Sequence, residues 1–309
     1  MTESEKKDTL TEPFVITDLR NGIGNILLEI LDGLFFANSL SKLTGKAYRY
    51  YALLTPRVLY GHQIAYTEEH HSMPHPLKLS EIYPNITFIN QAPSNTLNIN
   101  LERLIDISLL AYHPNNTRIN ITVNNLMNLL AELGSNMEIL PCLRYDVSIV
   151  DYVKRKFNTT NSLGIHLRLF QIGDYMRAKY PSVAWYNKAV QHVISQKGNP
   201  QRIYVVSGVS SAQSNSIATF VELILMLQSN YPLSEIIVVD KEPYYVDLVI
   251  LNLCSNLVIT NTTFSLASAL LTLNEQRLVV YPDLLDANHF QPITLPGFHL
   301  LPTEKYIQY

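Results

Sequence analysis

The residues best suited to chemistry lie in one short segment, residues 163–175, which reads LGIHLRLFQIGDY. Its first half is apolar enough for a buried strand, and side chains alternate along a strand, so His166 and Arg168 should point to the same side. A guanidinium at the end of an apolar strand is costly unless an anion compensates its charge. Arg168 is therefore predicted to bind a phosphate, which indicates a nucleotide-type substrate. Asp174 follows in the same loop as a further candidate.

A second candidate site is the hydroxyl-rich segment TNTTFS at residues 260–265. Thr262, Thr263 and Ser265 surround the expected start of a helix, where backbone N–H groups are free and the helix dipole is positive. Such a start binds phosphate oxygens, although an ordinary threonine cap would explain the same residues. Because Arg168 is expected at the same edge of a sheet, the combination favours a diphosphate site.

The elements that would position these residues alternate regularly in the second half of the chain. Expected strands and helices follow one another as strand 163–169, helix 183–196, strand 202–207, helix 213–229, strand 235–240, helix 243–253, strand 256–260, helix 264–273 and strand 277–281. Strands separated by helices of this length predict a parallel, doubly wound sheet. Ligands of such sheets bind outside the carboxyl ends of the strands. This rule brings His166, Arg168, Ser207 and Asp240 to one edge, together with the TNTTFS segment.

The first half of the chain opens like another α/β unit. A strand is expected at residues 14–19, a turn RNGIGN at 20–25 and an apolar helix at 26–43, which Gly45 would end by adopting positive φ. The turn lacks the third glycine of a dinucleotide-binding fingerprint. A tight strand-to-helix turn and a close approach of the backbone to a ligand therefore explain its glycines equally well.

Residues 46–157 are less regular. A short strand is expected at 86–89, polar Asn-rich linkers alternate with helices at 101–110 and 126–133, and a further helix is expected at 148–157. The predicted division of the chain is a disordered tail at 1–13, an N-terminal acceptor-side α/β domain at 14–157, a C-terminal donor-binding Rossmann-like domain at 158–290 and a C-terminal extension at 291–309.

Composition excludes several classes of function. The 309 residues are 47% hydrophobic and 16% charged, and a net charge of −3 gives no general attraction to nucleic acid or anionic lipid. The polar N-terminus lacks a signal sequence, and the longest apolar run considered, 220–227, is too short to span a bilayer, so a soluble cytoplasmic protein without a transmembrane segment is expected. The two cysteines, Cys142 and Cys254, are predicted to be reduced thiols. Oligomeric state is not indicated.

No metal site is predicted. Four histidines lie close together at His62, His70, His71 and His75, but their spacing matches no recognised ligand set. No Asp-x-Asp pair occurs in the chain for Mg²⁺ or Mn²⁺.

Taken in order, these segments resemble the motifs of the α-1,2-fucosyltransferase family and its bacterial and viral relatives. Family members open with Gly-Gly-Leu-Gly-Asn, where this chain has NGIGN at 21–25 followed by a long helix. They continue with His-x-Arg-x-Gly-Asp-Tyr, similar to HLRLFQIGDY at 166–175. They end with Asp-Leu-x-x-Met-x-x-Cys and Asn-Ser-Thr-Phe-Ser, similar to DLVILNLC at 247–254 and NTTFS at 261–265.

The resemblance implies two Rossmann-like domains in a GT-B arrangement. It implies an inverting transferase that moves L-fucose from a GDP-fucose donor to a hydroxyl of a glycan acceptor, a galactoside in α-1,2 linkage, without a metal or other cofactor. By the same resemblance, the catalytic candidates are Arg168 and Asp174, the donor is bound by His166, Arg168, Ser207, Asp240, Asn261, Thr263, Phe264 and Ser265, and the cleft is faced by Gly22, Gly24 and Asn25. A transferase for another nucleotide sugar and a catalytically silent glycan-binding relative remain alternatives.

The chain departs from the family pattern in three places. Three additional residues separate Arg168 from Asp174, Leu266-Ala267 replaces a Trp-Trp pair, and Gly208 follows Ser207 where relatives often carry an acidic residue. The general base is left open among Glu29, Asp32, Glu68, His70 and Asp174. Glu29 and Asp32 could equally be solvated surface carboxylates, which is the commoner situation.

Overall fold

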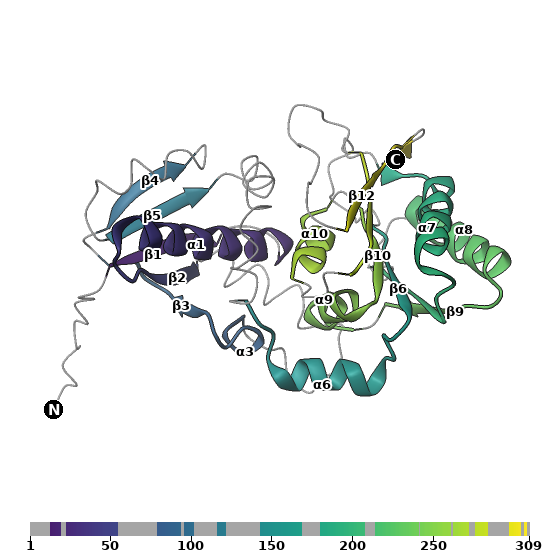
Figure 1. Cartoon of the computed structure of the whole chain (residues 1–309), viewed down its shortest axis with the longest axis horizontal. Coiled ribbons are helices and arrows are strands. Elements are labelled where there is room, and N and C mark those ends of the chain that lie inside the picture. The colour runs from purple at the N-terminus through teal and green to yellow at the C-terminus, as the bar shows by residue number, and fades with distance from the viewer. Residues whose placement is uncertain are drawn as a thin grey trace.

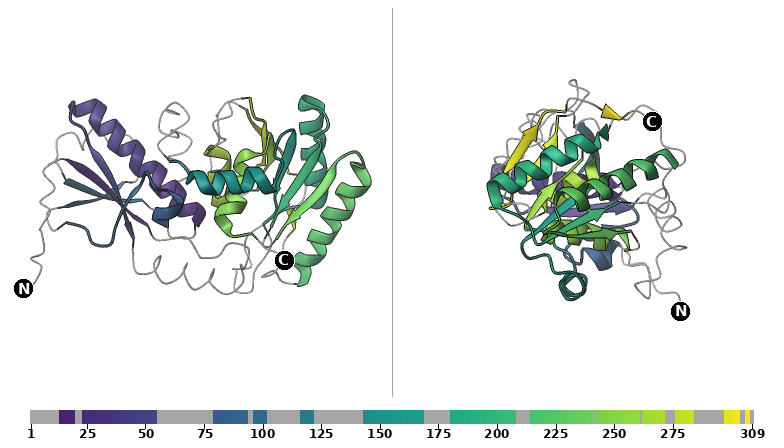
Figure 2. Two further views of the ribbon diagram at one scale, coloured as in Figure 1. Left: turned by 90° about the horizontal axis from the view of Figure 1, so that it is seen from below. Right: turned by 90° about the vertical axis from the view of Figure 1, so that its right-hand side faces the viewer.

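The computed structural model consists of two parallel sheets with helices around them, a mixed α/β architecture (Figures 1 and 2). The structure describes residues 13–19, 23–54, 79–93, 96–101, 116–121, 143–168, 180–207, 214–240, 242–260, 262–271, 276–283, 297–303 and 306–307. The helix predicted at 126–133, residues 102–110 of the helix predicted at 101–110 and residues 1–12 of the predicted tail lie outside these residues, as does Cys142. Leu101 is described as the last residue of a strand, and Cys254 is a buried free thiol.

The smaller sheet has five parallel strands in the order β3-β2-β1-β5-β4. Its elements are β1 (Phe14–Leu19), α1 (Ile23–Thr44), β2 (Arg49–Leu54), α3 (Leu79–Ile82), β3 (Thr87–Ile89), β4 (Leu97–Leu101) and β5 (Asn116–Ile121). The predictions of β1, of the long helix and of Gly45 at its end are confirmed, since Gly45 has a φ of 69°. The Asn-rich linker prediction is wrong at β4 and β5, because these segments pair in register with each other and β5 also pairs with β1.

The larger sheet has six parallel strands in the order β12-β11-β10-β6-β8-β9. Its elements are α6 (Val147–Lys156), β6 (Ser162–His166), α7 (Val183–Lys197), β8 (Arg202–Val206), α8 (Ser214–Asn230), β9 (Glu235–Val239), α9 (Tyr244–Leu253), β10 (Asn256–Val258), α10 (Thr263–Leu270), β11 (Val279–Pro282) and β12 (Phe298–Leu301). Strands β7 (Tyr180–Pro181) and β13 (Tyr306–Ile307) pair with each other in a separate two-stranded antiparallel sheet.

The predicted parallel sheet with intervening helices is confirmed, with two differences. Strand β12 belongs to the same sheet although its residues were assigned to a C-terminal extension. Strand β6 ends at His166, so Arg168 lies two residues beyond it and strand alternation does not fix its direction. Helices α7 and α8 pack on one face of the sheet, whereas α9 and α10 pack on the other (Figure 2).

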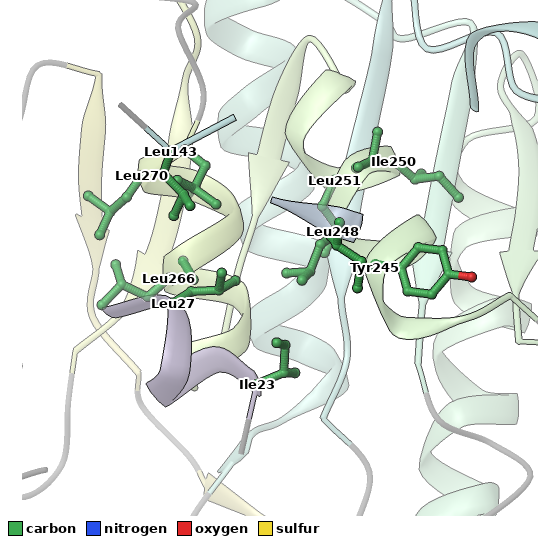
Figure 3. Packing of buried hydrophobic residues seen from close by; sticks show 14 of the residues in the cluster. Ile23, Leu27, Leu143, Tyr245, Leu248, Ile250, Leu251, Leu266 and Leu270 are labelled. Atoms are coloured by element: carbon green, nitrogen blue, oxygen red, sulfur yellow. The ribbon is translucent and has the colours of Figure 1, made fainter. Parts of the chain in front are cut away.

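One hydrophobic core connects the two sheets. Its buried residues come from α1, β2 and α3 on one side and from α9, α10 and β11 on the other. Figure 3 shows Leu27 of α1 beside Leu266 of α10, and Ile23 at the start of α1 belongs to the same cluster. The start of α1 is therefore fixed against the helix that follows β10.

Helix α1 is the one helix of the described residues that is long and apolar enough to cross a bilayer, with a mean hydropathy of 1.3 over its best window. However, 78% of that window is buried inside the protein. Both the length and the apolar character of α1 are thus accounted for by its packing against the smaller sheet and α10.

A buried arginine holds the end of α9. Arg277 is 2% exposed, its Nη1 donates a 3.1 Å hydrogen bond to the carbonyl of Asn252, and its Nη2 donates to the carbonyl of Leu251. Burial lowers the pKa of Arg277 to about 9, so it remains charged at neutral pH and compensates the negative end of the helix dipole.

Replacing Arg277 with methionine is expected to lower the free energy of unfolding by about 2 kcal/mol, because two buried carbonyls lose their donors. Urea denaturation checks this value. Arg155→Met, at an exposed position of α6, is the matched control and should leave stability nearly unchanged. Equal stability of the two variants would contradict a structural role for Arg277.

Candidate phosphate-binding site

The carboxyl ends of four neighbouring strands lie along one edge of the larger sheet. His166 ends β6, Ser207 follows β8, Asp240 follows β9 and Thr260 lies two residues beyond the end of β10. The strands are parallel and adjacent in the order β10-β6-β8-β9. The sheet therefore brings these residues to the edge where ligands of such sheets bind.

His166 is held rigidly at this edge. It is 7% exposed, its Nδ1 lies 3.0 Å from Oγ1 of Thr260, and its ring stacks on Phe264 with the centroids 5.1 Å apart. Burial, with a further contribution from the charge of Arg168, lowers the pKa of His166 to about 3. The imidazole is therefore neutral at pH 7 and can donate or accept a hydrogen bond, but it supplies no positive charge.

Arg168 is a positively charged residue that follows the end of β6 at this edge. It is half-buried and lies close enough to lower the pKa of the His166 ring through its charge. A positive charge two residues beyond the end of β6 stands where an anion at the carboxyl edge would meet it. The role of Arg168 as a phosphate ligand stays a prediction, and its position is set by the segment after β6 rather than by the strand.

The start of α10 carries a network of hydroxyl groups. Oγ1 of Thr262 accepts a 3.3 Å hydrogen bond from the backbone N–H of Ser265, as a helix N-cap does. The Ser265 side chain is fully buried and donates to the carbonyl of Thr260 at 2.9 Å. Thr262 and Ser265 thus shape the turn, whereas Thr263 and Phe264 are half-buried and begin the helix.

The first turn of α10 provides what an anion requires. A helix start presents backbone N–H groups and the positive end of the dipole. The hydrogen bond between Thr260 and His166 ties this turn to the end of β6, two residues from Arg168. The ordinary N-cap and the anion site are therefore compatible: the cap fixes the geometry in which the remaining N–H groups can act.

Ser207 and Asp240 occupy the next two strand ends. Ser207 is 4% exposed, and its Oγ has no hydrogen-bond partner within the described structure. A buried hydroxyl without a hydrogen-bond partner destabilises the fold. A ligand atom bound at the strand end could supply the missing hydrogen bond. Asp240 is half-buried and lies near the first turn of α9, where its charge contributes to raising the pKa of Asp247.

An acidic group at the start of α9 was not predicted as part of the site. Burial, and then the charges of Glu242 and Asp240, raise the pKa of Asp247 well above its usual value. Glu242 is compensated by Lys156 at the end of α6, with 2.5 Å between Oε1 and Nζ. The signal in the sequence was the cluster of three carboxylates around a strand end and a helix start, at positions 240, 242 and 247.

Gly24 of α1 packs directly against the backbone at the start of α10. A Cβ at this position would lie 2.6 Å from both Cα of Phe264 and the carbonyl carbon of Thr263, and closer still to the Phe264 nitrogen. The glycine is therefore explained by close packing of two backbones rather than by a ligand. The neighbouring Asn25 is half-buried and its Oδ1 has no hydrogen-bond partner among the described residues.

Two of the candidate general bases are buried in the smaller sheet's core. Glu29 is 2% exposed and Asp32 is 1% exposed, so the interpretation as solvated surface carboxylates is wrong. Burial, and then the nearby charge of Glu29, raise the pKa of Asp32 well above its usual value. Across from them, Oγ1 of Thr17 lies 2.6 Å from the Tyr50 hydroxyl.

Several predicted site residues lie outside the described residues: Gly22, Asp174 and Asn261, and the candidate general bases Glu68 and His70. Their roles stay predictions. Within the described part of the chain, no group of three or more His, Cys, Asp or Glu residues could hold a metal ion.

Comparison with known proteins gives similarity to solved structures alone. No family model matches this chain, and no curated protein has a significantly similar sequence. POFUT1 in complex with GDP is similar with a TM-score of 0.48 and 10% identity, covering 95% of this chain and 99% of the other. A glycosyl transferase of family 9 from Veillonella parvula has a TM-score of 0.47 and 10% identity, covering 95% of this chain and 88% of the other.

The NodZ α-1,6-fucosyltransferase co-crystallized with GDP is also similar, with a TM-score of 0.37 and 13% identity, covering 84% of this chain and 93% of the other. Identities of 10–13% and TM-scores below 0.5 do not assign the chain to a family. The functional assignment therefore depends on the residues of the site.

Proposed function

We propose that this protein is a glycosyltransferase that moves L-fucose from GDP-fucose to a hydroxyl of a glycan acceptor, with inversion and without a metal. The observation that carries the proposal is the arrangement of Arg168, neutral His166 and the start of α10 at one edge of a parallel sheet. The choice of GDP-fucose and of a galactoside in α-1,2 linkage rests on the resemblance of the sequence motifs.

In this proposal the acceptor oxygen attacks C1 of the sugar as the bond to the diphosphate breaks. The leaving GDP gains negative charge on its β-phosphate, and transition-state stabilisation must be directed there. Arg168 supplies a permanent cation for this charge, and the N–H groups that begin α10 supply oriented dipoles. His166 positions the Thr260–Phe264 turn and offers a hydrogen bond without competing for the proton.

Deprotonation of the acceptor is assigned to Asp174 as the working proposal, following the sequence motif. Asp32 lies on α1 and is buried with a raised pKa, which argues against direct contact of that carboxyl with an acceptor. If Asp174 is the base, Asp174→Asn should reduce kcat while GDP affinity stays close to that of the unmodified protein.

Arg168→Ala is expected to weaken GDP binding about 10- to 30-fold, because one charge-assisted contact to phosphate is lost. Isothermal titration calorimetry with GDP measures this directly. Arg202→Ala is the matched control: Arg202 begins β8 at the opposite end of the sheet and pairs with Glu235. GDP affinity that is absent in the unmodified protein, or unchanged in Arg168→Ala, would contradict the proposed function.

Turnover measurements distinguish the two alternatives, which are a transferase for another nucleotide sugar and a catalytically silent glycan-binding protein. Release of nucleotide from a panel of GDP- and UDP-sugars identifies the donor, and hydrolysis or transfer with a UDP-sugar alone would assign the site to another donor. A glycan-binding protein that retained the fold would bind GDP or glycan without turnover. Mass spectrometry of candidate glycans for added deoxyhexose then identifies the acceptor.

A further inference from the structure

The return segment of the chain, defined as β12 together with Thr303 and β13, is attached to the rest of the protein at several points. Strand β12 pairs in parallel with β11. Beyond it, the backbone N–H of Thr303 donates a 2.7 Å hydrogen bond to Oδ1 of Asp283. Strand β13 then pairs with β7, whose last residue directly precedes the N-cap of α7. The return segment is therefore anchored on both sides of the place where it meets the start of α7.

The first turn of α7 contacts the return segment through Trp185. This side chain is buried, and its Nε1 donates a 3.1 Å hydrogen bond to the carbonyl of Leu301, the last residue of β12. The helix begins at the same place, because Oγ of Ser182 accepts a 3.4 Å hydrogen bond from the backbone N–H of Trp185. A buried indole N–H requires an acceptor, so this bond ties the start of α7 to β12.

Tyr186 extends the connection to the end of β6. Its ring meets that of Trp185 edge to face, with the centroids 5.2 Å apart and the planes at 83°. The Tyr186 side chain is fully buried, and its hydroxyl donates a 3.4 Å hydrogen bond to the carbonyl of His166. His166 is the last residue of β6, and Arg168 follows two residues later. The peptide group that leaves the strand towards Arg168 is thus held by a side chain of α7.

His166 is consequently held by two different helices. Its ring contacts Thr260 and Phe264 at the start of α10, whereas its carbonyl contacts Tyr186 of α7. Holding both the ring and the carbonyl fixes the direction in which the chain leaves β6. That direction sets the place at which Arg168 carries its charge.

We infer that Tyr186 and Trp185 are positioning residues that connect the return segment to the phosphate site. Both belong to the buried cluster between α7 and the larger sheet, so they act through His166 and the residues that follow it. The part of this inference that concerns GDP rests on the proposed function. The part that concerns the exit of β6 rests on the hydrogen bonds alone.

The short ribbon of β7 and β13 can contribute to this support. Isolated two-stranded ribbons are marginally stable. Here, however, the two strands are held close together by their neighbours, since Thr303 is bonded to Asp283 and Ser182 caps α7. Pairing between anchored strands costs little chain entropy. Strand β13 therefore adds a further attachment at the residues that lead into α7.

The test compares Tyr186→Phe and Trp185→Phe with Tyr204→Phe. Tyr204 is the matched control, because it is equally buried and its hydroxyl donates a 2.9 Å hydrogen bond to the carbonyl of Asn158, before β6 begins. Amide hydrogen exchange of the nucleotide-free full chain is followed by mass spectrometry. At residues 165–168, exchange should be about tenfold faster in Tyr186→Phe than in Tyr204→Phe, because a bond that holds the strand exit is lost.

Calorimetric titration with GDP gives the second measurement. Binding should be about 3- to 10-fold weaker in Tyr186→Phe, about 2- to 3-fold weaker in Trp185→Phe and unchanged in Tyr204→Phe. A chain that stops at Thr303, and so lacks β13, should resemble Trp185→Phe. Combining this truncation with Tyr186→Phe should weaken binding by less than the product of the two separate effects, because both act through one connection.

Unchanged exchange at residues 165–168 in both α7 variants would overturn the inference. Faster exchange with unchanged GDP affinity would overturn it as well, since α7 would then support the strand without positioning the phosphate site. Fully independent effects in the combined variant would contradict the connection to the return segment. An unmodified protein that does not bind GDP would contradict the proposed function, and the exchange rates would still decide whether Tyr186 and Trp185 hold the exit of β6.

Discussion

Replacing Gly24 with alanine is expected to weaken GDP binding about 100-fold and to destabilise the fold. The new Cβ would overlap backbone atoms of Thr263 and Phe264, which cannot rotate away as a side chain could. Overpacking of this kind costs about 3 kcal/mol, of which the higher helix propensity of alanine recovers about 1 kcal/mol. The remaining strain is relieved by moving α10 away from α1, which displaces the N–H groups proposed to bind phosphate.

Calorimetric titration with GDP and urea denaturation together measure this prediction. Gly33→Ala is the matched comparison, because its Cβ would also meet occupied space, 2.8 Å from Cγ2 of Thr17 and closer to the Tyr50 ring. Both variants should be less stable than the unmodified protein. Only Gly24→Ala should also bind GDP more weakly when the affinity is calculated for the folded fraction alone. Normal GDP affinity in a folded Gly24→Ala protein would show that the contact between α1 and α10 does not position the site.

The second large effect is expected at Asp32. Its pKa is raised in the folded protein, first by burial and then by Glu29, so between the unfolded and the folded pKa the folded protein binds a proton that the unfolded chain does not bind. The associated stability is fully present below the unfolded pKa and is lost as pH rises towards the folded pKa. In that interval the loss is about 1.4 kcal/mol per pH unit.

Asp32→Asn removes this titration. The stability of the variant should therefore rise relative to that of the unmodified protein as pH rises from the unfolded pKa towards the folded pKa, by at most about 1.4 kcal/mol per pH unit. Urea denaturation at several pH values measures the difference. Asp151→Asn changes the charge by the same amount at an exposed position of α6 and should run parallel to the unmodified protein. Parallel curves for Asp32→Asn as well would show that the carboxyl is ionised in the folded state.

The burial of Asp32 has a signal in the sequence that spacing alone conceals. Glu29 and Asp32 stand three residues apart, as surface carboxylates often do, but the helix around them has no polar face. Ile26, Leu28 and Leu31 are buried on several sides of it. A helix that is apolar all round is a core helix, and its few carboxylates are then buried with it.

The sequence analysis missed strands β4 and β5 for a different reason. Segments β4 (LNINL) and β5 (NTRINI) are rich in asparagine, which disfavours strands, and polar residues interrupt each of them. Their pairing with each other, and that of β5 with β1, outweighs this local preference. Strand β12 has only four residues, and its parallel pairing with the preceding strand β11 is what places it in the sheet.

Local sequence patterns were enough to predict the alternation of strands and helices beyond residue 162, because the spacing of apolar residues and the turn residues are local properties. They also predicted which strand ends carry His166, Ser207 and Asp240, since parallel strands share one carboxyl edge. Tertiary structure alone decided that His166 is neutral and stacked on Phe264, and that Gly24 packs on the same turn. These properties depend on burial and on contacts between residues about 100 to 240 positions apart, which no local pattern encodes.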